Sequence, residues 1–124
     1  MSGSEQEVED VAEKRDSILE ALDSAWSKFG SFVLTEVFPT IPELTDDHKS
    51  DAKLAFDRDA MLALPFLRDF IEANRDKLLA GNVDFFRALL PKELQEAKIP
   101  SHLTKKGVIF TRVFISIIKD LDSL

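Results

Sequence analysis

The segment around His48 has the residue types and the spacing that could hold a metal ion. His48 and Asp51 are three residues apart, and Asp47 and Asp51 are four apart, so in a helix these side chains would share one face. A protein metal site also needs ligands from other segments and groups that orient them. The same residues are typical of a capped, solvated helix start, where acidic side chains stabilise the positive helix end. We therefore expect no metal and no other cofactor.

Other kinds of catalytic chemistry find little support in the sequence. The chain has no cysteine, which excludes disulfide bonds, thiolate metal sites and cysteine nucleophiles. It also lacks Gly-x-Ser-x-Gly, His-Glu-x-x-His and glycine-rich phosphate-binding motifs. The second histidine, His102, falls at a predicted helix start, and Asp57 and Asp59 are too close in sequence to share a helix face. We expect a protein that is not an enzyme and has no small-molecule substrate.

The charge distribution is uneven and restricts the partners and the location of the protein. The 124 residues include 16 Lys and Arg and 23 Asp and Glu, a formal net charge of −7, and such a field repels phosphate backbones. The most apolar stretch, residues 108–118, is too short and too polar to cross a bilayer. Residues 1–30 carry eight acids, three bases and no apolar run, unlike a secretory signal. We expect no direct nucleic-acid binding, no membrane span, and a location in the cytoplasm, the nucleus or a particle.

A long amphipathic helix is predicted at the N-terminus. Apolar residues recur every three or four positions between Val11 and Phe32, which indicates a helix. We expect it to run from about Glu5 to Phe38 and to end before Pro39, because proline cannot continue a helix. Residues 1–5 would form a flexible tail, and residues 6–124 would form a single helical domain. Gly30 is the weakest position of this helix, costing about 1 kcal/mol relative to alanine.

The predicted length of this helix has a consequence for its packing. About 33 residues at 1.5 Å each reach roughly 50 Å, which exceeds the width of a compact domain of this size. Either the helix bends at Gly30 and folds back on the bundle, or its N-terminal turns project and pack against a second copy or another protein.

Turn and capping residues divide the rest of the chain into shorter helices. Thr45 is predicted to cap a second helix that runs to about Ala63. Pro65 would begin a third helix, unless one kinked helix continues through it. Further start and stop signals are a helix end at Gly81, a cap at Asn82 and a single turn opened by Pro91.

The last helix is predicted to start at Ser101 or Thr104 and to lie in the middle of the bundle, because apolar residues cover most of its circumference. Its Val, Ile and Phe content also suits a β-strand, but a lone strand cannot satisfy its hydrogen bonds. The predicted fold class is therefore all-α, an irregular bundle of five or six helices with a buried C-terminal helix.

The function that the sequence favours is binding to another protein. Ten Phe and one Trp, with no Tyr, indicate an aromatic core, and Trp26 lies at the edge of the first helix's apolar stripe, where it either seals the core or meets a partner. We expect an adaptor, regulatory subunit or structural component that binds another protein or a second copy of itself. The predicted contact residues are Glu9, Glu13, Asp16, Glu20, Asp23 and Trp26.

Two other functions remain open at this point. The first is an acidic mimic of nucleic acid that blocks a DNA- or RNA-binding protein, with carboxylates on the first helix and farther along the chain. The additional carboxylates would be those of Asp46, Asp47, Asp51, Asp57 and Asp59. Binding through such a mimic would weaken steeply with salt, whereas binding through apolar anchors would not. The second is an enzyme or metal protein that uses His48 and Asp51.

Overall fold

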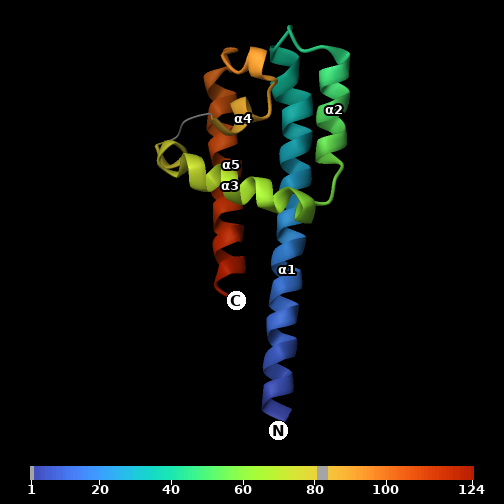
Figure 1. The fold of residues 1–124 in the computed structure, drawn as a ribbon, viewed down its shortest axis with the longest axis vertical. Helices are drawn as coiled ribbons and strands as arrows, with labels where there is room; N and C mark the ends of the chain where they lie inside the picture. The colour runs from blue at the N-terminus through green and yellow to red at the C-terminus, as the bar shows by residue number, and fades with distance from the viewer. Residues whose placement is uncertain (1, 81–83) are drawn as a thin grey trace.

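A computed structural model describes the backbone of residues 2–80 and 84–124 and the side chains of residues 10–80 and 86–124. Over these residues the protein is all-α. Helices α1 and α5 lie side by side, α3 crosses both of them, and α2 lies along the end of α1 distant from the N-terminus (Figure 1). The five α-helices of the described residues are α1 (Ser2–Phe32), α2 (Asp46–Phe56), α3 (Ala60–Leu79), α4 (Asp84–Ala88) and α5 (Ser101–Asp122). This arrangement confirms the predicted all-α bundle with a long N-terminal helix.

Helix α1 does not bend at Gly30, contrary to one of the two expected alternatives. The helix begins at Ser2, earlier than expected, and continues to Phe32. A π-helical turn, η1 (Val33–Val37), and a 3₁₀ turn, η2 (Phe38–Thr40), then follow, so the α-conformation ends before the expected Phe38. Gly30 is buried, and a Cβ at this position would lie 2.7 Å from Cγ of Phe56. Glycine at this position therefore permits the close packing of α2 on α1.

The break between α2 and α3 lies at Asp57–Asp59, and the predicted boundary at Pro65 was wrong. The side chain of Thr45 accepts a hydrogen bond from the amide of His48 (3.2 Å), which confirms the predicted cap of α2. Helix α2 nevertheless ends at Phe56, and Asp59 caps α3 by accepting from the amide of Met61 (3.0 Å). Pro65 then lies inside α3. The predicted signals at Gly81 and Asn82 lie outside the described residues.

The C-terminal segment is a helix, and the alternative of a strand was wrong. Its predicted caps were also wrong, because Pro100 occupies the N-cap position without a side-chain hydrogen bond and Ser101 is the first helical residue. Thr104 instead donates from Oγ1 to the carbonyl oxygen of Pro100 (3.3 Å). The predicted single turn after Pro91 is present as η3 (Lys92–Leu94). One face of α5 is buried in the core, whereas Ile109 and Val113 on the other face are 59% and 40% exposed.

The core is an aromatic cluster between α1, α2, α4 and α5. Phe29 is fully buried at its centre, and its ring centroid lies 5.4 to 6.2 Å from those of five aromatic neighbours, Trp26, Phe56, Phe86, Phe110 and Phe114. Edge-on, tilted and stacked pairs of this kind add about 0.5–1.5 kcal/mol each to the effect of area burial. This cluster holds α1 against α5 and thereby determines which part of α1 is buried and which part is exposed. No helix in the described residues is long and apolar enough for a bilayer crossing.

Candidate protein interaction surface

The N-terminal half of α1 projects beyond the rest of the bundle (Figure 1). The side chains of residues 10–17 are all exposed, and partial burial begins at Ile18. Val11 is 47% exposed although it belongs to the same apolar stripe that forms the core farther along α1. This part of α1 is therefore an amphipathic helix that the rest of the described chain covers only in part.

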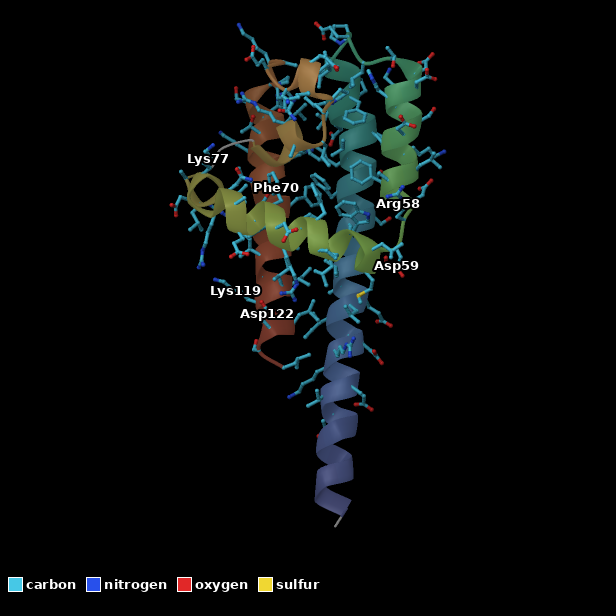
Figure 2. The ribbon with its side chains drawn as sticks, in the orientation of Figure 1. Arg58, Asp59, Phe70, Lys77, Lys119 and Asp122 are labelled. Carbon is cyan, nitrogen blue, oxygen red and sulfur yellow. The ribbon has the colours of Figure 1, made fainter. Side chains whose placement is uncertain are left out.

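An acidic recess lies where α3 begins beside α1. Asp16, Glu20 and Asp23 line it together with Asp59 and the apolar side chains of Leu19 and Met61; the recess has a volume of about 370 Å³. Figure 2 shows Asp59 at the start of α3, where this helix crosses α1. We call these six residues the acidic recess. Helical spacing places Glu13, which is exposed, on the same face of α1 one turn earlier.

Of the predicted contact residues, three thus come together, Glu13 lies beside them, and Glu9 belongs to the residues whose side chains are not described. Met61 was missed as a member of this surface, and Asp59 was named only among the carboxylates of the alternative nucleic-acid mimic. Both residues are far from Asp16 in the sequence. They lie near it in space only because α3 crosses α1. An acidic residue before an apolar run is typical of a helix cap, so the sequence around Asp59 indicates a cap and not a position beside α1.

Trp26 does not belong to the surface, and its assignment as a contact residue needs correction. The side chain is 5% exposed, and its ring lies 5.2 Å from Phe56, 6.1 Å from Phe114 and 6.2 Å from Phe29. Its Nε1 has no hydrogen-bond partner among the described residues. The physical reason is that α2 and α5 close over this edge of α1 and leave the indole in the aromatic cluster. Leu19 and the 40% exposed Met61 are the apolar groups of this region that a partner can reach.

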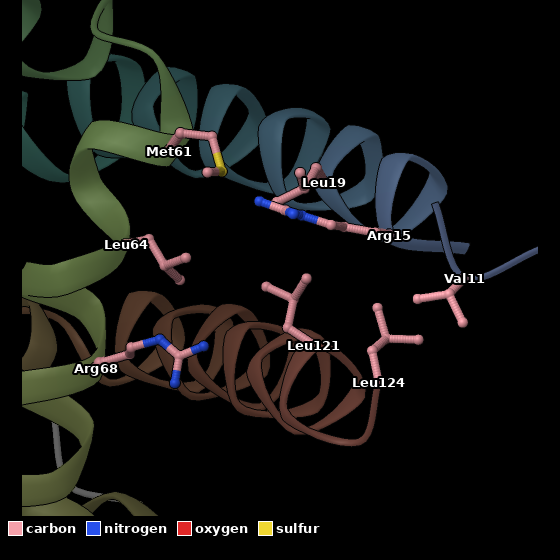
Figure 3. Close-up of a pocket in the computed structure, with 8 residues that line it drawn as sticks. All are labelled: Val11, Arg15, Leu19, Met61, Leu64, Arg68, Leu121 and Leu124. Carbon is pink, nitrogen blue, oxygen red and sulfur yellow. The ribbon is translucent and has the colours of Figure 1, made fainter. Parts of the chain in front are cut away.

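A second, apolar groove opens on the other side of Leu19 and Met61, between α1 and the end of α5. It has a volume of about 380 Å³, and its described lining consists of Val11, Arg15, Leu19, Met61, Leu64, Arg68, Leu121 and Leu124. Figure 3 shows Val11 and Leu124 at one end of the groove and the α3 residues at the other. Arg68 forms an ion pair with Asp122, with 2.7 Å between Nη1 and Oδ1. We call this feature the α1–α5 groove.

The residues considered for metal binding or catalysis lie elsewhere. His48 and Asp51 line a shallow recess of about 320 Å³ whose other walls are mainly apolar, including Phe38 and Leu90. His102 is exposed in the first turn of α5. Within the described residues, no group of three or more His, Asp or Glu side chains is arranged to hold a metal ion.

Comparison with known proteins does not assign a function to these surfaces. No protein-family model matches the chain, no curated protein matches it, and no solved structure matches it.

Proposed function

We propose that the protein is a small non-enzymatic interaction module, such as an adaptor, a regulatory subunit or a structural component of a larger assembly. It binds a basic segment of another protein through the acidic recess and the adjoining acidic face of α1. The observation that carries this proposal is the position of Asp59 and Met61, which brings a fourth carboxylate and an accessible thioether beside the acids of α1.

The chemistry of the acidic recess suits a partner that combines Lys or Arg with an apolar side chain. Four carboxylates in one recess attract a cationic segment and accelerate its association. Each exposed ion pair contributes little by itself, typically 0.2–1 kcal/mol. The lifetime of the complex therefore depends on an apolar anchor that packs against Leu19 and Met61. A flexible methionine adapts to side chains of different shapes.

A comparison of two charge-reversed variants tests this proposal. The first carries Asp16→Lys, Glu20→Lys and Asp23→Lys in the acidic recess. The matched control carries Glu43→Lys, Glu93→Lys and Glu96→Lys, three exposed acids outside α1, so the net charge changes equally. Both are used with the wild-type protein in affinity purification from the native source, with quantitative mass spectrometry. We expect proteins that the control retains and the first variant loses. Equal retention by the two variants would contradict the proposal.

The salt dependence of binding distinguishes this proposal from a nucleic-acid mimic. The apolar side chains of Leu19 and Met61, which line the recess together with the four carboxylates, favour the interaction module. With the purified partner, we expect the affinity to fall modestly between about 50 and 300 mM salt, since apolar contacts are not screened. A steep linear fall of log K with log salt, together with displacement of the protein by DNA or RNA, would instead support the mimic.

A further inference from the structure

We infer that the exposed face of α5, together with a groove between α3 and α5, binds an acidic amphipathic helix of another protein. This surface is opposite in charge to the acidic recess, and only α3 contributes residues to both. The inference goes beyond the proposed function and does not depend on it.

The exposed face of α5 carries a stripe of basic residues with an apolar side chain among them. Five exposed residues follow one another at alternating steps of four and three positions, which places them on one face of the helix. They are Lys105, Ile109, Arg112, Ser116 and Lys119. Ile109 is 59% exposed between the first two cations. We call these five residues the basic stripe; it extends over about 21 Å at a rise of 1.5 Å per residue.

The positive charge of the basic stripe is not compensated within the described chain. Residues 101–119 contain four bases and no acid, although the whole chain has a net charge of −7. The base outside the stripe, Lys106, pairs with Glu36 at 3.2 Å, whereas the three cations of the stripe form no ion pair with a described side chain. The acids of α5 are confined to its end, at Asp120 and Asp122. The stripe therefore attracts an acidic partner.

A groove between α3 and α5 adjoins the basic stripe at Lys119. It has a volume of about 290 Å³, and its apolar lining consists of Ile71, Leu79, Ile115 and Ile118. Its charged lining consists of Arg68, Glu72, Arg75, Lys119 and Asp122. Arg68 and Asp122 form an ion pair, which leaves two cations and one carboxylate. Figure 2 shows Lys119 and Asp122 on α5 near the crossing of α3. We call this feature the α3–α5 groove; it suits an apolar side chain with a carboxylate beside it.

The extent and the composition of this surface favour a helix as the occupant. The α3–α5 groove is at the lower limit of pockets that enclose a small molecule, and the basic stripe continues far beyond it. Phosphate backbones are repelled by the net charge of −7 and by Glu72 in the groove. A single apolar residue, Ile109, gives the stripe too little apolar area to enter a membrane. A helix with acids at every third or fourth position and an apolar residue among them matches the stripe along its length.

Nuclear magnetic resonance of the full chain with synthetic peptides tests this inference. The probe is a helical peptide of about 20 residues whose one face carries glutamates at steps of three and four positions, with a leucine between them and a phenylalanine at each end. The control peptide has glutamine in place of every glutamate. We expect the acidic peptide to shift the amide signals of residues 105–119 and of Leu79. The glutamine peptide should bind at least about tenfold more weakly.

Two charge-reversed variants locate the contact. Lys105→Glu with Arg112→Glu changes the basic stripe and should weaken binding of the acidic peptide at least about fivefold, because two attractions become repulsions. The matched control, Lys49→Glu with Lys53→Glu, reverses two exposed cations of α2 and should change the affinity by less than about twofold. Folding of both variants is monitored by far-ultraviolet circular dichroism and by the fluorescence of the buried Trp26.

Four results would overturn the inference. The first is no binding of the acidic peptide at about 1 mM, and the second is equal binding of the two peptides or equal affinities of the two variants. The third is tighter binding of single-stranded DNA or of vesicles that contain phosphatidylserine, because the partner would then carry phosphate. The fourth is a concentration-dependent shift of the same amide signals in the protein alone, because the occupant would then be a second copy.

Discussion

Replacing Gly107 with alanine adds one methyl group at the tightest contact between α5 and the aromatic core. A Cβ at this position would lie 1.8 Å from Cε2 of Phe86 and 2.4 Å from its Cζ. Phe86 is 2% exposed, and its ring centroid lies 5.7 Å from that of Phe29 and 5.6 Å from that of Phe32. The ring is therefore confined by its neighbours and cannot move aside without displacing them.

Two opposing effects determine the size of the change. Alanine is favoured over glycine inside a helix by about 0.8–1.0 kcal/mol. Overpacking of a filled core costs about 1–3 kcal/mol, and a gap of 1.8 Å is far below the contact distance of about 3.5–4.0 Å between carbon atoms. The upper end of that range applies, so we expect Gly107→Ala to lower the free energy of unfolding by about 2 kcal/mol net.

Urea unfolding followed by circular dichroism and Trp26 fluorescence measures this change. Ser116→Ala, at an exposed position of the same helix, is the control and should be neutral or slightly stabilising. Adding Phe86→Leu to Gly107→Ala should cost less than Phe86→Leu costs alone, because the smaller side chain relieves the clash; a double-mutant cycle gives the coupling energy. A Gly107→Ala protein as stable as the wild type, with no coupling to position 86, would refute the reasoning.

Three further sets of substitutions test other parts of the fold, each by urea unfolding. Trp26→Ala should lower the free energy of unfolding by about 3–5 kcal/mol, because it deletes a large core side chain. Trp26→Phe should lower it much less, because Nε1 has no hydrogen-bond partner among the described residues. A loss below about 0.5 kcal/mol for Trp26→Ala would contradict the burial of Trp26 in the core. Thr45→Ala should cost about 1 kcal/mol through loss of the α2 cap, and no effect would contradict the cap. Lys106 forms an ion pair with Glu36 at 3.2 Å, and its Nζ also lies 5.5 Å from the centroid of the Phe32 ring. Lys106→Ala removes both interactions and should therefore lower the free energy of unfolding more than Glu36→Gln, which removes only the ion pair. Equal losses would contradict a contribution from the ring.

Local patterns in the sequence predicted much of the helical framework, because periodicity and caps act over a few residues. The spacing between Val11 and Phe32 defined α1, and Thr45 defined the start of α2. The same reasoning failed where local signals compete. Pro65 was taken as a boundary, but the break follows Phe56, at a segment that contains neither glycine nor proline. An aspartate cap determined the boundary there.

The candidate site was predicted only in part, because it depends on contacts between distant segments. Periodicity placed Asp16, Glu20 and Asp23 on one face of α1, but the crossing of α3 brings Asp59 beside them. The burial of Trp26 likewise depends on Phe56 and Phe114, which belong to other helices. A single sequence contains no local signal for either contact.

Hydrogen–deuterium exchange measured by mass spectrometry is the most direct test of whether the projecting half of α1 is a binding surface. The protein is compared alone and in the complex isolated from its native source, with exchange followed over α1, the start of α3 and the exposed face of α5. We expect partner binding to slow amide exchange in residues 10–23 and around Met61. Protection confined to other helices, with exchange in α1 unchanged, would contradict a binding role for this surface.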